Sequence, residues 1–132
     1  MKKPSEVLEL YSKRLTEGLE KKLSPSAFEL TFSFRSPRVA ALSGVLVFRS
    51  GHVLEFDEIL KQTKDTAERV KYRYHVMDKD NNLVFRYDNV PHHKNVKTFP
   101  HHKHIADTVI DSDAPTLLDV VYEVEFLVLK AL

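Results

Sequence analysis

Strict alternation of apolar and polar residues constrains the fold of this chain more than any other feature of its sequence. It runs from Ala27 to Arg35, where every second residue is phenylalanine or leucine, and it returns from Val70 to Met77. In a β-strand, successive side chains point to opposite faces, so both stretches predict strands with one buried face. A sheet with a covered face is therefore the centre of the expected fold.

Three further segments are predicted to form strands: Val39–Phe48, Val53–Leu60 and Leu83–Asn89. Between the first two, residues 49–52 supply the small and polar side chains of a hairpin turn. Residues 61–66 are predicted to be a surface connection. Residues 91–104 are too rich in proline and histidine for a regular element, although His101–Ile105 fits a short edge strand.

The strands at 70–77 and 83–89 form the clearest hairpin, and its turn decides which side chains face each other. If Asn81 and Asn82 are a two-residue loop, Val76 lies opposite Tyr87 and His75 lies opposite Asp88. A four-residue loop changes these partners but keeps the faces. The core face would carry Tyr72, Tyr74, Val76, Phe85 and Tyr87, and the other face would carry Arg73, His75, Arg86 and Asp88.

Helical spacing of apolar residues predicts one helix at each end of the chain. The first covers Ser5–Leu23, with Ser5 as its N-cap, and the second covers Thr116–Leu129. Thr116 and Asp119 have the spacing of a capping box. The second helix is apolar on most of its circumference, so we expect it to pack across the sheet, or else to meet a partner or a second copy with its surplus apolar face.

These elements predict an α+β fold: an antiparallel sheet of about five strands in a meander, packed by an N-terminal and a C-terminal helix. The length of 132 residues suits one domain, residues 1–132. Because cysteine is absent, disulfides, thiolate metal ligands and a cysteine nucleophile are excluded. Histidine and carboxylate chemistry remain.

Charge and hydropathy limit the kind of partner. Twenty basic and 19 acidic residues give a formal net charge of +1, so any site for a polyanion must be local. The N-terminal residues run directly into a charged helical pattern without the apolar core of a signal peptide, and no stretch approaches transmembrane length. We therefore expect a cytoplasmic protein that makes no contact with a membrane.

Five of the seven histidines lie in the thirteen positions from 92 to 104, where an even distribution would place fewer than one. They are His92, His93, His101, His102 and His104. This segment directly follows the strand that carries Arg86 and Asp88. We therefore expect the histidines to lie beside the charged face of the hairpin and to form one composite site with it.

Three kinds of chemistry fit such a set. RNA cleavage without a metal needs a base for the 2′-hydroxyl proton, an acid for the leaving 5′-oxygen and cations for the charged phosphorane, and histidine can take both proton-transfer roles. Metal binding is the second, because His102 and His104 would point to one side of a strand while nearby histidines or Asp88 complete the ligands. In the third, the histidines only pair with aspartates or cap loops.

Residues 72–104 also contain three unusual sequence segments: Tyr72-Arg73-Tyr74-His75, Phe85-Arg86-Tyr87-Asp88-Asn89-Val90-Pro91-His92-His93 and Thr98-Phe99-Pro100-His101-His102-Lys103-His104. This pattern resembles that of the TumE-type toxins of toxin–antitoxin pairs. The resemblance implies a growth-inhibiting protein that is neutralised by an antitoxin with a helix-turn-helix DNA-binding domain. It implies no assignment of catalytic residues.

Small toxins of such pairs commonly attack translation through RNA, so the leading hypothesis is a metal-independent ribonuclease without a cofactor. The acid and base roles would be shared by one histidine from each of two groups, His92 and His93, and His101, His102 and His104. Asp88 would orient a histidine. Phosphate would be bound by a further set, Arg73, His75, Arg86 and Lys103.

Two other functions remain open. One is a metal-dependent nuclease or hydrolase that uses the same histidines as ligands. The other is a protein-binding module without catalysis, which engages a partner through the histidine segment or the second helix. If the second helix meets a second copy of the chain, the protein forms a homodimer through its C-terminal helix.

Overall fold

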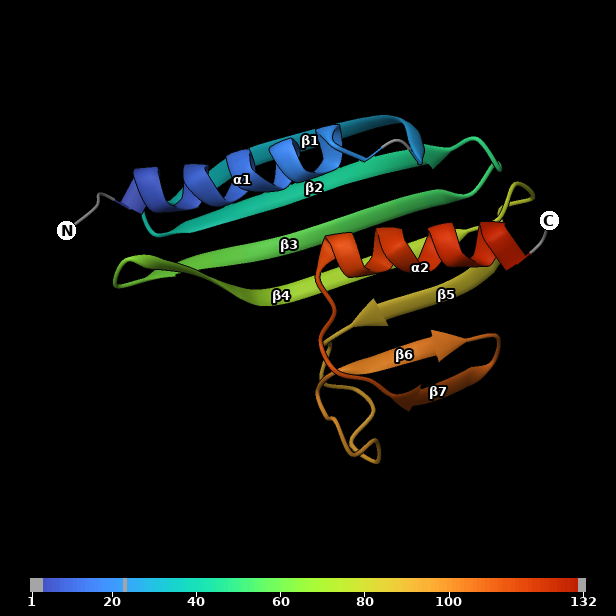
Figure 1. Ribbon diagram of the computed structural model, residues 1–132. Coiled ribbons are helices and arrows are strands. Elements are labelled where there is room, and N and C mark those ends of the chain that lie inside the picture. The colour runs from blue at the N-terminus through green and yellow to red at the C-terminus, as the bar shows by residue number, and fades with distance from the viewer. Residues whose placement is uncertain (1–3, 23, 131–132) are drawn as a thin grey trace.

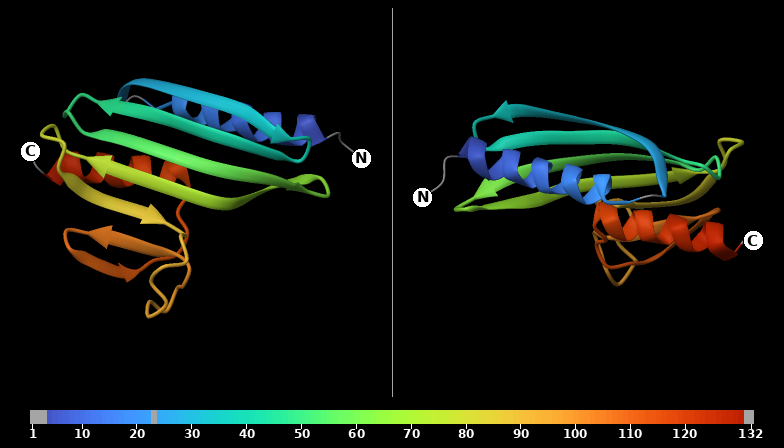
Figure 2. Two further views of the ribbon diagram at one scale, coloured as in Figure 1. Left: turned by 180° about the vertical axis from the view of Figure 1, so that it is seen from behind. Right: turned by 45° about the horizontal axis from the view of Figure 1, so that its top comes forward.

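The computed structural model describes residues 4–22 and 24–130. It has two layers: one antiparallel sheet of seven strands, and two helices that lie on the same face of that sheet (Figure 1). Seen from behind, the other face carries no helix of the described residues (Figure 2). The predicted α+β class with two flanking helices is therefore confirmed. The two sides of the sheet are called the covered face and the open face below.

The strands follow one another across the sheet in their chain order, as a meander requires. Every neighbouring pair is antiparallel. The strands are β1 (Pro25–Ser36), β2 (Val39–Phe48), β3 (Val53–Thr63), β4 (Thr66–Met77), β5 (Leu83–Asp88), β6 (His102–Ile105) and β7 (Thr108–Asp111). The predicted number of about five strands is therefore wrong.

The additional strands, β6 and β7, form a short hairpin after the histidine-rich loop. Strand β6 corresponds to the edge strand that the sequence suggested, but β7 pairs with it and takes the place at the edge. Ile105 lies opposite Thr108, and Ala106 in the turn has a positive φ of 52°. Glycine or asparagine normally marks this backbone conformation, so an alanine gave no sign of the turn.

The predicted surface connection at residues 61–66 is also wrong. These residues complete the hairpin of β3 and β4, in which Thr63 lies opposite Thr66. The turn between them has Lys64 at a positive φ of 57°, and Thr66 Oγ1 donates a hydrogen bond to Thr63 O over 2.9 Å. The polar composition of this segment reflects a hairpin that extends beyond the core, rather than an irregular loop.

The hairpin of β4 and β5 has a longer turn than predicted. Asp78 N donates to Asn82 O over 2.9 Å, and the Asp78 carboxylate accepts from Asn82 N over 3.0 Å, so the turn covers residues 78–82. The predicted cross-strand pairs are therefore wrong, and His75 lies opposite Arg86 rather than Asp88. Because the register differs by an even number of residues, each side chain stays on its predicted face.

The helices are α1 (Pro4–Glu20) and α2 (Leu117–Lys130). Ser5 lies inside α1 rather than at its N-cap, and the predicted end at Leu23 falls outside the described residues. The capping box of α2 is confirmed: Thr116 N donates to Asp119 Oδ2 (2.9 Å), and Asp119 N donates to Thr116 Oγ1 (3.2 Å). Neither described helix is long and apolar enough to cross a membrane.

The core lies between the helices and the covered face. All five side chains predicted to face it are buried, namely Tyr72, Tyr74, Val76, Phe85 and Tyr87. Glu58 is buried beside them, and its carboxylate accepts hydrogen bonds from Tyr11 Oη of α1 (2.6 Å) and from Tyr74 Oη (2.5 Å). A buried carboxylate needs such donors, so this contact joins α1 to the sheet.

Candidate functional site

The open face carries polar side chains where β4, β5 and β6 lie side by side. Two rows of directly opposite residues cross these strands, Arg73-Asp88-His102 and His75-Arg86-His104. Directly opposite residues of an antiparallel pair share a face of the sheet. The strand register therefore gathers six chemically active side chains at one place.

The loop between β5 and β6 brings His93 to these rows. The centroid of its ring lies 4.9 Å from that of His102 and 5.4 Å from that of His104, and the latter two centroids are 4.9 Å apart. The loop is tied to β7 by Lys97 N, which donates to Asp111 Oδ1 over 2.7 Å. The two histidine groups of the sequence thus meet through these three rings, which we call the histidine cluster.

Asp88 lies under the histidine cluster, with a side chain only 5% exposed. Its Oδ1 accepts hydrogen bonds from His102 Nε2 (2.9 Å) and Val90 N (3.0 Å), and its Oδ2 accepts one from Arg86 Nε (3.1 Å). Charge-assisted hydrogen bonds of this kind offset the cost of burying a carboxylate. Asp88 therefore fixes the positions of Arg86, His102 and the start of the loop.

His102 is the buried member of the histidine cluster. Its Nδ1 lies 2.9 Å from Pro100 O, and its Nε2 lies 2.9 Å from Asp88 Oδ1. A carbonyl and a carboxylate are both acceptors, so either contact is a hydrogen bond when its own ring nitrogen carries the hydrogen. With a side chain 2% exposed, His102 is held from both sides and has little access to a ligand.

His104 has the opposite environment. Arg86 Nη2 lies 3.1 Å from His104 Nε2, and because a guanidinium only donates, this ring nitrogen is the acceptor. Burial lowers the pKa of His104, and the charge of Arg86 lowers it further, whereas Asp88 acts in the opposite direction. His104 is therefore neutral near pH 7, and its Nε2 lies between the donor Arg86 Nη2 and the acceptor Asp88 Oδ2, the latter 3.5 Å away.

His75 lies on the open face beside Arg86 but outside the histidine cluster. Burial lowers its pKa, the charges of Arg73 and Arg86 lower it further, and Glu55 raises it. Its Nδ1 is buried and has no hydrogen-bond partner among the described residues. His75 is therefore neutral near pH 7 and can only offer a phosphate a hydrogen bond, not a charge.

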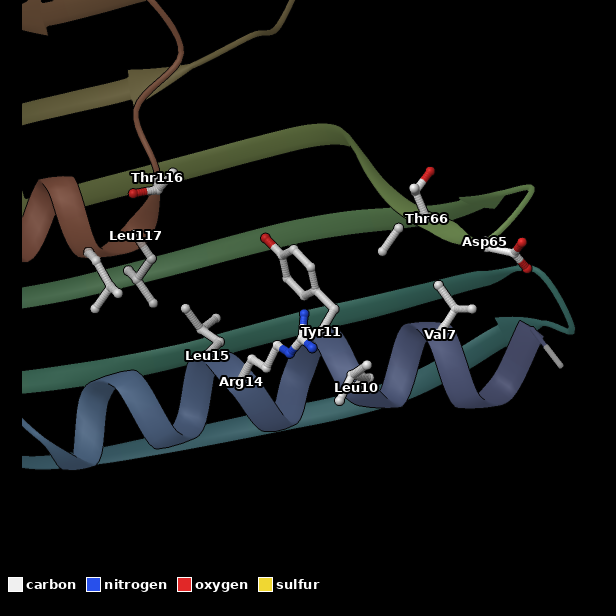
Figure 3. A pocket seen from close by; sticks show the side chains of 11 residues that line it. Val7, Leu10, Tyr11, Arg14, Leu15, Asp65, Thr66, Thr116 and Leu117 are labelled. Carbon is white, nitrogen blue, oxygen red and sulfur yellow. The ribbon is translucent and has the colours of Figure 1, made fainter. Parts of the chain in front are cut away.

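A cavity of about 220 Å³ opens at the histidine cluster. It is lined by Arg73, Arg86, Asp88, Val90, His92, His93, His102 and His104. A larger cavity of about 520 Å³ lies on the covered face, between α1 and the start of α2, and its lining includes Val7, Leu10 and Leu15 (Figure 3). That lining contains no histidine, so the smaller cavity is the candidate site.

Two predicted site residues lie on the covered face instead. His101 Nδ1 is 2.8 Å from Tyr72 Oη, and the two rings stack with their centroids 5.7 Å apart. Lys103 Nζ donates to Glu123 Oε2 of α2 over 2.5 Å and lies 4.8 Å from the ring centroid of Tyr87. The sheet separates both side chains from the histidine cluster, so the structure gives them packing partners rather than access to the cavity.

The histidine cluster also has features of a metal site. His93, His102 and His104 offer ring nitrogens that lie within 4.8 Å of one another. A tetrahedral zinc ion with bonds of about 2.05 Å needs nitrogens about 3.4 Å apart, so the rings would have to move together. Arg86 donates to His104 Nε2, and its charge repels a cation. A metal ion bound through this nitrogen would therefore have to displace Arg86.

A family model covers most of this chain. The model, described as Toxin TumE, matches residues 15–128, a range that includes all the described strands and the histidine cluster. The protein belongs to the TumE toxin family. No curated protein and no solved structure matches the chain. The resemblance found in the sequence is thus confirmed, and membership of the TumE family implies an antitoxin partner for this chain.

Two groups of the site were not predicted from the sequence. Pro100 O accepts from His102 Nδ1, and Val90 N donates to Asp88 Oδ1. Both are backbone groups, which carry no signal in the residue type. Only the path of the loop between β5 and β6 could reveal them.

Proposed function

We propose that this TumE protein cleaves RNA without a metal ion, with His93 and His104 as the acid and the base. The observation that carries the proposal is that three histidine rings meet beside an arginine and a buried aspartate at an open cavity. Two histidines near one phosphate can supply both proton transfers near neutral pH. Because the proposed substrate is RNA, we expect the toxin to act in the cytoplasm.

His104 is assigned as the base because its lowered pKa keeps it neutral. Its Nε2 accepts from Arg86 before the substrate binds. When Arg86 turns to a phosphate oxygen, Nε2 becomes free to take the proton of the ribose 2′-hydroxyl. The 2′-oxygen then forms a bond to phosphorus while the bond from phosphorus to the 5′-oxygen breaks, which leaves a 2′,3′-cyclic phosphate.

His93 is assigned as the acid that protonates the leaving 5′-oxygen. It is half-buried, lines the cavity and contacts the ring of His104, so both proton transfers fit around one phosphate. Arg86 and Arg73 would hold the phosphate oxygens and stabilise the phosphorane. His102 is a positioning residue because it is buried, and the exposed His92 would contact the substrate at the rim.

The test is incubation of the purified protein with RNA, with and without a chelator. His93→Ala and His104→Ala are each expected to slow cleavage at least about 100-fold, the usual contribution of one proton-transfer group. A substrate with 2′-deoxyribose at the cleaved position should not react, because it lacks the attacking oxygen. Well-folded protein that leaves RNA intact would refute the proposal.

His52→Ala is the matched control variant. His52 lies in the hairpin between β2 and β3, where its Nδ1 is 2.7 Å from the hydroxyl of the neighbouring Ser50. The variant removes one histidine that does not line the cavity, so its cleavage rate should equal that of the wild type. Circular dichroism of all variants separates a loss of chemistry from a loss of fold.

A metal-dependent nuclease is the second candidate, because His93, His102 and His104 offer three ligand atoms close together. In that case a chelator would abolish cleavage and zinc would restore it. The 2′-deoxy substrate separates the two mechanisms further, since a metal-activated water needs no 2′-hydroxyl. Cleavage that survives the chelator and requires the 2′-hydroxyl would exclude this second candidate.

The non-enzymatic alternative is a module that acts by binding a protein. For the antitoxin we propose a protein with a helix-turn-helix domain. A stable complex with it, together with no turnover on RNA, would favour the binding role. The homodimer through the C-terminal helix that the sequence suggested is the competing arrangement to the one proposed below, and it would use the exposed side chains of Tyr122, Phe126 and Leu129 on α2.

A further inference from the structure

Strand β1 is a long edge strand at the outer side of the sheet (Figure 1). It has twelve residues and, among the described strands, pairs with β2 alone. Edge strands are usually short, or protected by lysine, proline or bulges. The irregularities of β1 lie only at its ends, between Pro25 and Ala27 and between Phe34 and Ser36. Its regular centre is therefore available for pairing with another strand.

The apolar row of β1 is incompletely covered. Phe28, Leu30 and Phe32 face the covered side but are only half-buried, and Phe34 is 40% exposed. The rings of Phe32 and Phe34 meet edge to face, with centroids 5.1 Å apart. Core-facing aromatic side chains that remain in contact with water would gain burial from one more strand.

The polar row of β1 is complementary to itself. It consists of Glu29, Thr31 and Ser33, and Arg35 follows them at the irregularity between Phe34 and Ser36; all four side chains are exposed. No ion pair involves Glu29 or Arg35 within the described residues. In an antiparallel pairing of two copies centred on Phe32, Glu29 of each copy lies opposite Arg35 of the other, and Thr31 lies opposite Ser33.

We propose that β1 pairs with β1 of a second copy of this chain, antiparallel and centred on Phe32. The two sheets then join into one, with all helices on the same side. Leu30 of each copy lies opposite Phe34 of the other, which covers the exposed ring. The interface would combine backbone hydrogen bonds, an apolar row and two symmetric Glu29–Arg35 ion pairs.

Among the possible registers of the β1–β1 pair, the charges of Glu29 and Arg35 favour the one centred on Phe32. A two-fold axis that keeps the faces allows only shifts that pair residues of the same row. The next registers place Glu29 opposite Ser33 or opposite Pro37, and a larger slip places Glu29 opposite Glu29. Of these arrangements, only the one centred on Phe32 brings opposite charges together.

The proposed interface is far from the histidine cluster. Three strands, β2, β3 and β4, separate β1 from β5 in the sheet. No β1 residue lines the cavity at the histidine cluster, although Glu29 and Arg73 both line a neighbouring hollow on the open face. A failure of the dimer proposal says nothing about RNA cleavage, and a failure of the cleavage proposal says nothing about the dimer.

The test measures the dissociation constant of the full chain by analytical ultracentrifugation. Glu29→Arg places two arginines opposite each other twice in the dimer, and Arg35→Glu does the same with glutamates. Each single reversal is expected to raise the dissociation constant about tenfold or more. The double variant E29R/R35E restores opposite charges and should return the constant to within about threefold of the wild-type value.

Two further variants complete the experiment. Asp107→Arg reverses an exposed charge in the turn between β6 and β7, at the opposite edge of the sheet from β1, and should leave the dissociation constant unchanged. Phe126→Asp disrupts the exposed stripe of α2 and should also leave it unchanged. A monomeric wild type, single reversals without effect, a double variant that is not rescued, or a dimer broken by Phe126→Asp would each overturn the proposal.

Discussion

Replacing Asp88 with asparagine keeps the shape of the side chain and removes its charge. Oδ1 still accepts from His102 and Val90, but the new amide nitrogen faces Arg86 Nε, which is also a donor. A lost charge-assisted hydrogen bond costs about 1.5–3 kcal/mol, and a broken, fully buried ion pair costs about 3–5 kcal/mol. Because the side chain of Arg86 is 31% exposed and regains water, we expect the free energy of unfolding to fall by about 2–3 kcal/mol.

Asp57→Asn is the matched control on the same face of the sheet. Asp57 Oδ2 lies 3.4 Å from Arg73 Nη1, but the Asp57 side chain is 63% exposed. Such surface pairs contribute about 0–1 kcal/mol, so the control should lose less than about 1 kcal/mol. Urea unfolding followed by circular dichroism gives both free energies. Equal losses for the two variants would refute the view that Asp88 organises the histidine cluster.

Three other measurements test the structure. The pKa of His104 is lowered in the folded protein, so just below pH 6.5 the unfolded chain binds more protons and the free energy of unfolding falls as the pH falls. His104→Gln should reduce the slope of the free energy of unfolding against pH by up to about 1.4 kcal/mol per pH unit, as measured by urea unfolding at several pH values. At Gly44 an added Cβ would lie 2.7 Å from Phe56 Cε1, so Gly44→Ala should cost about 1–3 kcal/mol in the same assay, and a stability equal to the wild type would contradict the packing. Thr116→Ala should lower the thermal midpoint by removing about 1 kcal/mol of capping, and Thr116→Ser should restore most of it.

The parts of the fold that the sequence predicts are those with strong side-chain periodicity. Strands β1, β2 and β5 and helix α2 were located closely because their apolar residues recur with the period of the element. The tip of the β3–β4 hairpin and strand β7 were missed because they extend past the core and carry no apolar alternation. The turn of β4 and β5 was misjudged because Asp78 accepts a hydrogen bond from Asn82 N and thereby lengthens it.

The sequence predicts which kinds of residue form the candidate site, but it does not predict which individual histidines lie there. The clustering of histidines near Asp88 was visible in the sequence, and the alternation in the hairpin placed Arg86 and Asp88 on one face. The faces of the residues after residue 91 could not be predicted, because the loop resets the alternation before β6. His101 and Lys103 consequently lie on the covered face, while His102 and His104 lie on the open one.

The strand order has a consequence for the timing of synthesis. Each strand pairs with the one made just before it, so the sheet can grow while the chain is still being translated. The histidine cluster, by contrast, needs the loop after β5 and the whole of β6. A nascent chain that ends before residue 102 can hold most of the sheet and still lack the pair of histidines assigned to catalysis. Most of the sheet can therefore form on the nascent chain before the histidine cluster can assemble.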